Sequence, residues 1–256
     1  MNQAVWTLVL VPAAVYLAGV ARSRSPWPVA RTAAWLAGLG CLAVALTGPL
    51  ATTHGDLRAH MAAHLLLGMV APVLLVLARP STLLLRALPA PAARRVSRAL
   101  RTAPVRVLTD PFVATGLNAA GLWLLYGTSL LTATGTGLLT AMLHSPGLHL
   151  LVSVHVLLTG WLATAAVLAL DPIGHRRGVV ARAVALAAGA AAHDVLAKAL
   201  YAAPPAGVTG AEAGAQLMYH GGTVVHVLVA SLLWRQWYRS RATVRDAERA
   251  ALPTPA

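Results

Sequence analysis

Two histidines stand at the start of a segment that is otherwise apolar enough to cross a lipid bilayer. His60 and His64 lie near the beginning of the stretch from Leu57 to Pro80, four residues apart, so on a helix they share one face. An imidazole is costly to bury in hydrocarbon, and an ionisable side chain inside a membrane usually marks a functional site. Imidazole nitrogens bind copper, zinc and iron, so this pair indicates a metal site within a membrane.

The composition is that of a membrane protein. Of the 256 residues, 58% are hydrophobic and only 11% are charged, whereas a soluble domain carries about 25% charged residues. The net charge of +13 would also suit nucleic acid, but the arginines form short clusters between apolar runs, as in membrane proteins. We therefore expect no nucleic-acid partner. The single cysteine, Cys41, leaves no disulfide framework and no paired-cysteine metal motif.

Seven apolar segments approach the length of about 20 residues that a helix needs to cross a bilayer. They cover residues 5–20, 32–50, 57–78, 112–131, 148–170, 179–202 and 215–238. The first lacks the basic start of a signal peptide, so we expect it to be retained as a span. The sequence predicts an all-α, polytopic transmembrane helical bundle that forms a single domain over residues 1–240.

The basic residues give this bundle a direction. All 20 lysines and arginines except Arg58 and Lys198 fall in alternate loops or in the C-terminal tail. Basic loops stay in the cytoplasm, so we expect the N-terminus outside and the C-terminus in the cytoplasm. Asp110, just before the fourth span, is expected to cap the N-terminus of that helix.

Two cytoplasmic segments lie outside the spans. The loop 80–110 carries most of the arginines together with scattered leucines and valines. One interpretation is a basic amphipathic helix on anionic lipid headgroups, and the other is a solvated connector broken by prolines. The polar tail 241–256 is expected to fray.

This topology assigns a depth to every histidine. Nine of the ten histidines fall on the outer side, and seven of these lie inside four of the spans. The seven are His60, His64, His149, His155, His193, His220 and His226. His149 and His155 diverge by about 120° on a helix, and so do His220 and His226, so one site can take only one of each pair. Met61 is a possible further ligand, because a thioether suits Cu(I).

Asp194 and Lys198 form a second group of polar residues, four apart on the sixth span and directly after His193. One interpretation is a structural ion pair, since a lone charge in the membrane is costly. The other is that Asp194 orients a ligand histidine, as carboxylates beside metal sites often do. Tyr126 and the tryptophans are interpreted as interfacial anchors or packing residues. Gly221 and Gly222 are expected to let another backbone approach closely.

Six segments, in this order, resemble the CtaG-type cytochrome c oxidase assembly factors that serve caa-type oxidases. They are HMAAHLLLGMVAPVLLVLARP from His60, DPF from Asp110, HSPGLHLLVSVHVLLTGW from His144, ALDP up to Pro172, AAAHDVLAKALYA around His193, and GAQLMYHGG from Gly214. The resemblance implies a multi-pass protein of the cell membrane that helps to mature a copper-containing oxidase, with oxidase subunits as partners and copper as the bound ion. The family's histidine motifs fall on His60, His64, His149, His155 and His193. The stretch YHGGTVVH departs from the family pattern, so His220 and His226 are possible additional ligands outside the set that the resemblance implies.

Two other functions remain open from the residues alone. A membrane-embedded hydrolase would hold zinc through the histidines and activate a water near Asp194. A haem- or quinone-associated redox protein would use two histidines as axial ligands. An assembly factor needs metal ligands but no nucleophile or general base, so the expected protein is a metal-binding assembly factor rather than an enzyme.

Overall fold

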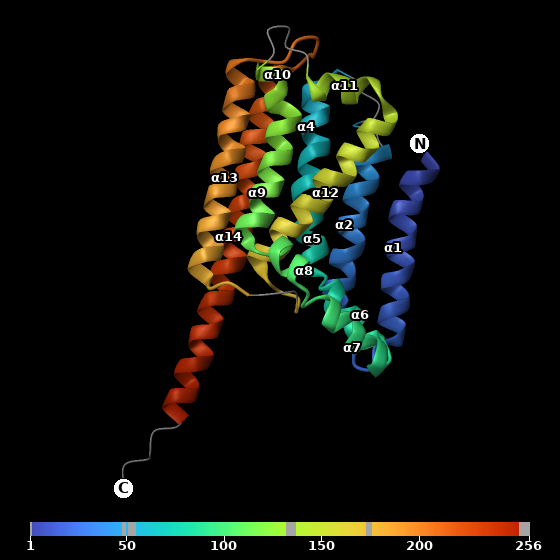
Figure 1. Ribbon diagram of the computed structural model, residues 1–256, viewed down its shortest axis with the longest axis vertical. Helices are drawn as coiled ribbons and strands as arrows, with labels where there is room; N and C mark the ends of the chain where they lie inside the picture. Colours follow the sequence, from blue (N-terminus) through green and yellow to red (C-terminus); the bar gives the residue numbers. More distant parts are fainter. Residues whose placement is uncertain (1, 48–49, 51–54, 132–136, 173–175, 251–256) are drawn as a thin grey trace.

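The computed structural model describes residues 2–47, 50, 55–131, 137–172 and 176–250. Helices make up 85% of these described residues, and the only pairing of β type across them is an isolated bridge between Asp56 and Thr209. The all-α class predicted from the sequence is confirmed. Figure 1 shows an elongated bundle whose helices run alternately up and down, with the C-terminal helix extending beyond one end.

The helices follow one another along the chain with short connections. The long elements before the basic segment are α1 (Asn2–Arg22), α2 (Val29–Thr47), α4 (Leu57–Leu65), the π-helical turn η1 (Leu66–Val70) and α5 (Ala71–Leu77). Then come α6 (Pro80–Ala87), α7 (Ala90–Ala99), α8 (Ala103–Leu108), α9 (Pro111–Leu122), the π-helical turn η2 (Trp123–Gly127) and α10 (Thr128–Leu131). The last are α11 (Leu138–His144), α12 (Pro146–Leu168), α13 (Val179–Ala202) and α14 (Ala211–Ala250).

Six helices in the described residues are long and apolar enough to cross a membrane. They cover Gln3–Arg22, Val29–Thr47, Leu57–Ala87, Gly147–Leu168, Val179–Ala202 and Ala211–Ala242, and six of the seven predicted spans fall on them. The predicted span 112–131 forms the continuous run α9–η2–α10, which packs against α12 and α13 (Figure 1). This run is not one of the six, because Asn118 and several glycines and threonines dilute its apolar residues.

Several predicted boundaries differ from the structure. The second helix begins at Val29 instead of residue 32 and is described as far as Thr47, while its predicted continuation through residues 48–49 lies outside the described part. The loop 80–110 is folded into α6, α7 and α8 instead of a connector without regular structure. The expected fraying of the tail from residue 241 is wrong as far as Ala250, because α14 continues to that residue.

The basic segments meet at one end of the bundle. Figure 1 places α6, α7 and α8 at the same end as the start of α13 and the protruding part of α14. Asp110 caps α9 as predicted, since its carboxylate accepts a hydrogen bond from the Phe112 amide at 3.0 Å, and it also forms an ion pair with Arg177. Asp171 links α12 to α6 by accepting hydrogen bonds from the amides of Ser81 and Thr82.

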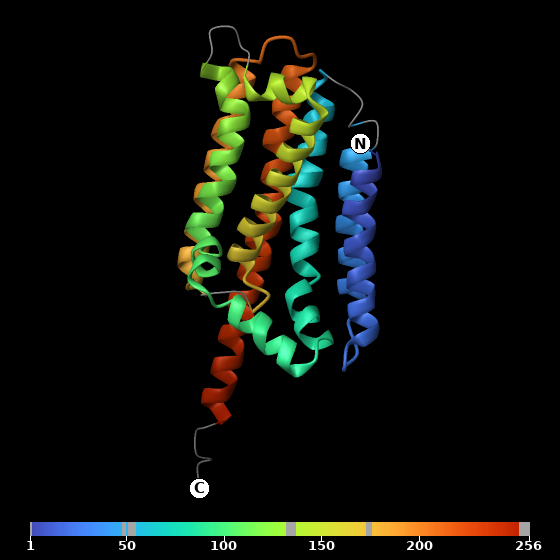
Figure 2. The same ribbon diagram turned by 45° about the vertical axis from the view of Figure 1, so that its right-hand side comes forward.

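The site described below depends on two π-helical turns and on close glycine contacts. η1 lies directly after His64, and η2 contains Tyr126. Such turns inside α-helices are frequent at functional sites. Gly160 of α12 approaches η1 so closely that a Cβ there would overlap the carbonyl oxygen of Gly68. Helix α4 packs against α14, and α1 and α2 lie toward one side (Figure 2).

Candidate metal-binding site inside the bundle

Polar side chains from three helices meet in the interior of the bundle. His64 comes from the end of α4, His193 and Asp194 from α13, and His226 from α14. These four residues are called the mid-bundle group below. The apolar core that surrounds them is built from buried leucines, valines and methionines. The polar residues of the mid-bundle group therefore have one another, and not bulk water, as their polar neighbours.

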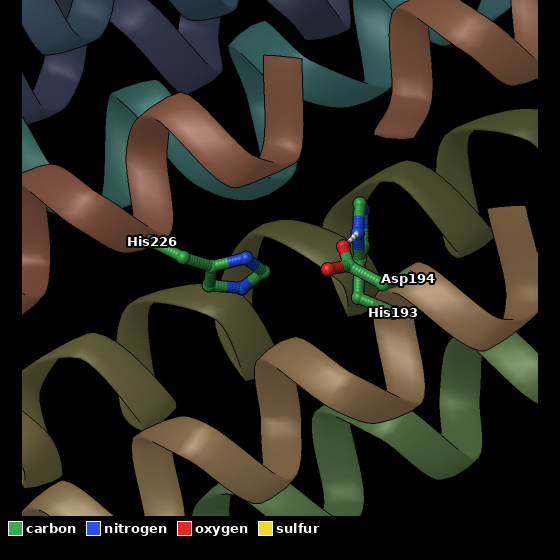
Figure 3. A group of neighbouring side chains, drawn as sticks. All are labelled: His193, Asp194 and His226. Atoms are coloured by element: carbon green, nitrogen blue, oxygen red, sulfur yellow. Dashed lines mark ion pairs between the residues drawn. The ribbon is translucent and has the colours of Figure 1, made fainter. Parts of the chain in front are cut away.

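His193, Asp194 and His226 are the most compact part of the mid-bundle group. One potential ligand atom from each lies within 4.8 Å of the other two. Figure 3 shows the carboxylate of Asp194 and the ring of His226 pointing toward one another from facing helices. The Nδ1 atom of His193 is 3.5 Å from a carboxylate oxygen of Asp194, and the rings of His193 and His226 are 5.3 Å apart between centroids.

His64 adds a third imidazole from a third helix. Its ring lies nearly parallel to that of His193, with centroids 6.0 Å apart. Both rings are almost fully buried, with 5% and 4% of their residue surface exposed. A cavity of about 70 Å³ is lined by His64, His193 and His226 together with Met69 and Asn118. The three imidazoles therefore border one small enclosed space.

Several polar atoms of this group have no hydrogen-bond partner within the described residues. They are Nε2 of His64, both ring nitrogens of His193, one oxygen of Asp194 and Nδ1 of His226. A buried polar group that lacks a partner typically costs about 1–3 kcal/mol. Polar atoms at this depth are rarely left unsatisfied, so this concentration of them indicates a bound species that satisfies them together.

His60 faces a different and smaller space. Its Nε2 atom is 3.0 Å from the hydroxyl of Tyr126, and a cavity of about 40 Å³ is lined by His60, His149, Tyr126 and also His64. The rings of His60 and His64 both approach the Tyr126 ring edge-on, at 5.8 and 5.9 Å. Tyr126 thus separates His60 and His149 from the mid-bundle group, while His64 borders both spaces.

Other predicted ligands lie away from this group. His155 is exposed, and its ring packs against Gly121 of α9. His220 is exposed beside the Tyr219 ring. Met61 is fully buried in the apolar core. As the angular separation predicts, only one of His220 and His226 reaches the mid-bundle group.

Asp194 and Lys198 do not form the ion pair that was one interpretation of their spacing. The Lys198 ammonium lies 5.0 Å from the centroid of the Tyr219 ring, and in the part of the chain that the structure describes no ion pair joins it to Asp194. The partner of Asp194 is His193. This arrangement agrees with the other interpretation, in which Asp194 orients a histidine.

The close packing of His193 depends on a glycine. A Cβ at Gly222 would overlap the His193 ring, and one at Gly221 would overlap the side chain of Leu65. The approach of another backbone that was expected at these glycines is therefore wrong: side chains from α13 and α4 lie against them instead. Because α14 has no side chain at Gly222, the His193 ring fits between the helices.

The donor set fits a transition-metal ion. Metal–nitrogen bonds of about 2 Å place two ligand atoms of one tetrahedral ion roughly 3.3 Å apart. The ligand atoms of His193, Asp194 and His226 lie within 4.8 Å of one another. They therefore need to approach one another by about 1.5 Å at most to bind one ion, a distance that small side-chain rotations can cover. Imidazole and carboxylate suit Cu(II) and Zn(II), and a site of given geometry binds Cu(II) more tightly than Zn(II). Met69, at the cavity wall, is the thioether nearest to this role.

The sequence interpretation underestimated two residues. His226 stood outside the ligand set that the family pattern implies, yet it contributes to the compact group with His193 and Asp194. Tyr126 was interpreted as an anchor or packing residue, but its hydroxyl contacts His60 and its ring lies between two histidines. Its position within an apolar span was the available signal, since a buried tyrosine hydroxyl usually has a partner.

The fold and this polar group define a class: a helical membrane protein with imidazoles and a carboxylate gathered inside an apolar bundle. Residues 14–240 match the cytochrome c oxidase caa3 assembly factor family, and the chain belongs to this family. This confirms the family that the sequence motifs resemble.

Similar proteins of the curated set come from mycobacteria. The chain is 35% identical over 175 residues to uncharacterized proteins of Mycobacterium bovis and Mycobacterium tuberculosis, an alignment that covers 63% of this chain and 25% of each relative. It is 33% identical over 180 residues to an uncharacterized protein of Mycobacterium leprae, covering 65% and 26%. The chain thus spans about a quarter of the length of these relatives. No solved structure matches it.

Proposed function

We propose that this protein is an assembly factor of the cell membrane that carries copper, as cargo for a cytochrome c oxidase, on the mid-bundle group. The observation that carries the proposal is the convergence of His193, Asp194 and His226 within 4.8 Å, in a chain of the oxidase caa3 assembly family. The unpartnered ring nitrogens around one cavity support it, since a metal ion satisfies several lone pairs at once.

The donors suit an ion that is carried and then released. Three nitrogen or oxygen donors leave a coordination position open, and sites with an open position exchange their ligands. Either Asp194 would bind the ion as the third donor, or it would hold the His193 ring in orientation while His64 supplies the third donor as an imidazole. No feature among the comparisons favours the hydrolase that the residues alone left open, and a carrier needs no water activation.

We also infer the topology in the membrane. Seven spans, including the run 111–131, place the N-terminus outside and the C-terminus in the cytoplasm. The gathering of the basic segments at one end of the bundle (Figure 1) supports this orientation, because basic segments stay in the cytoplasm. Helices α6 to α8 combine arginines with exposed Leu84, Val107 and Leu108, a pattern that suits anionic headgroups.

The test is metal analysis of detergent-purified protein from copper-supplemented cells. We expect wild-type protein to retain copper and a His193→Ala, His226→Ala double variant to lose it. His220→Ala is the matched control, because His220 is on the same helix as His226 but exposed beside Tyr219. Melting temperatures of all three proteins in detergent separate loss of copper from loss of the fold. Wild-type protein that melts normally but binds no copper would refute the proposal.

A further inference from the structure

An open groove runs along the outer surface between α13 and α14. Its volume is about 700 Å³, and its walls are mostly apolar, with Ala183, Ala187 and Ala190 on α13 and Val227 and Ala230 on α14. Every residue of this groove belongs to two of the helices that are long and apolar enough to cross a membrane. The groove therefore opens to the lipid phase and not to water.

This groove reaches the mid-bundle group. Asp194 and His226 line the groove, and His226 also lines the enclosed cavity that His64 and His193 border. Figure 3 shows why: Asp194 and His226 face each other across the gap between the two helices. The mid-bundle group thus has a lateral opening on the side of α13 and α14.

The chemistry at this opening distinguishes between occupants. Nδ1 of His226 has no hydrogen-bond partner among the described residues, and one oxygen of Asp194 has only the ion pair with His193 at 3.5 Å, although the walls around them are apolar. A lipid tail fills an apolar groove but offers nothing to a carboxylate or an imidazole. A membrane helix with a polar, metal-binding side chain at the same depth can fill the groove and also reach these two residues.

The walls also suit a helix. Ala183, Ala187 and Ala190 lie one turn apart on the same face of α13, and small residues at this spacing let another backbone approach closely. From Val180 to Asp194 the groove follows α13 for about 21 Å at 1.5 Å per residue, most of the hydrocarbon thickness. At the other end Arg241 lies over the Trp237 ring, 4.7 Å from its centroid, which places a charge beside the end of a docked helix.

We propose that this groove receives a transmembrane helix of the client oxidase subunit, and that copper passes from the mid-bundle group to a ligand side chain on that helix. This inference rests on the proposed function. The transfer is a ligand exchange: each bond from copper to His226 or Asp194 that breaks is replaced by a bond to an imidazole or thioether of the client. The ion keeps its oxidation state, and the neutral imidazoles neither gain nor lose a proton.

The first test fills the groove without touching the ion's ligands. Ala187→Trp places a large side chain in the groove, while Ala188→Trp is the matched control, because Ala188 is exposed on the same helix but does not line the groove. We expect both variants to bind copper like wild type. Oxidase activity in membranes should fall to the level of cells that lack the protein for Ala187→Trp and remain normal for Ala188→Trp.

A second variant guards against disturbance of the ion's ligands. Ala183→Trp fills the groove one turn farther from Asp194, and it should also retain copper and lose oxidase activation. Copper-loaded Ala183→Trp and Ala187→Trp proteins that support normal oxidase activity would overturn the groove proposal while the proposed function stands. If wild-type protein binds no copper while Ala187→Trp still abolishes oxidase activation, the carrier function is refuted and the groove remains a docking site.

The identity of the occupant is tested by photo-crosslinking in cells that make the oxidase. Benzoyl-phenylalanine at position 187 should form an adduct with a transmembrane segment of an oxidase subunit, and the same group at position 188 should not. An adduct with a second copy of this chain, or adducts with lipid alone, would show a different occupant and overturn the proposal.

Discussion

The imidazole rings of His64 and His193 lie within 14° of parallel, with centroids 6.0 Å apart, although they come from helices far apart in the sequence. Neither ring has a hydrogen-bond partner at Nε2 among the residues that the structure describes. Two buried, nearly parallel imidazoles gain little from each other, because ring stacking leaves their nitrogens without hydrogen bonds. Both gain from an ion in the cavity that they border with His226.

The first prediction separates His64 from His60, which the sequence treats as one pair. His64→Ala removes an imidazole from the cavity and should weaken copper binding, by about 10-fold for the loss of one supporting group. His60→Ala should leave copper binding nearly unchanged. It should lower the melting temperature instead, because it removes the partner of the buried Tyr126 hydroxyl, a loss of about 1–3 kcal/mol. Copper titration and thermal melts of both variants check this.

The reverse outcome has a clear meaning. If His60→Ala loses copper while His64→Ala retains it, the ion binds in the smaller cavity that His60 and His149 line, and the mid-bundle group has another role. Tyr126→Phe serves as the control for the hydrogen bond, since it removes the hydroxyl and keeps the ring between the two histidines.

The sequence predicted the helical class and six of the seven helices well, because long apolar runs and proline or arginine boundaries are local signals. The run 111–131 shows where this reasoning weakens. Asn118 makes the run less apolar, yet its carboxamide oxygen accepts a hydrogen bond from the Thr159 hydroxyl at 3.2 Å. A partner on another helix satisfies that polar group, and no local pattern in the sequence states which helix it is.

The histidines show a second limit. Helical spacing correctly separated His220 from His226, but spacing alone does not say which of the two faces inward. That choice depends on how α14 packs against α13 and α4, where Gly222 admits the His193 ring. These are contacts between helices, and a local pattern does not specify them.

The second prediction tests that glycine. Gly222→Ala places a methyl group where the His193 ring lies, so the ring must move away from His226 and Asp194. We expect copper affinity to fall while the helix itself gains intrinsic propensity, by about 1 kcal/mol relative to glycine. Gly116→Ala on α9 is the matched control, because a Cβ there meets nothing within 4 Å. Equal copper binding in both variants would contradict the placement of His193.

The third prediction concerns stability and pH at the N-terminus of α9. Burial raises the pKa of Asp110. The hydrogen bonds from Arg177 and from the Phe112 amide and the charge of Arg177 lower the pKa by more than burial raises it, so the net pKa is depressed. A depressed carboxyl pKa stabilises the fold above the unfolded value of about 3.9, and this contribution is lost as the pH falls through the folded pKa.

Asp110→Asn keeps a capping side chain, since asparagine and aspartate are similar N-caps, but it removes the charge. It should therefore destabilise the protein at pH 7 by about 0.3–1 kcal/mol, through loss of the ion pair with Arg177 and of the favourable interaction with the helix dipole. The difference from wild type should shrink as the pH falls below about 4 and through the depressed folded pKa, where the wild-type carboxyl becomes protonated. Thermal melts in detergent at several pH values measure this. Arg177→Ala keeps the cap and removes the ion pair, so it should lose less at pH 7. A gap between wild type and Asp110→Asn that does not change with pH would rule out the carboxylate as its cause.

The fourth prediction compares the two charged residues of α13. Asp194→Asn keeps the size of the side chain but removes the negative charge beside His193, so copper affinity should fall about 10- to 100-fold, as for other groups that support metal ligands. Lys198→Ala should change copper binding little, because the ammonium lies over Tyr219 and forms no ion pair with Asp194 among the described contacts. Copper titrations and melting curves of the two variants provide the measurement. Equal losses of stability in both variants, with copper affinity unchanged, would instead assign Asp194 and Lys198 to a shared structural role.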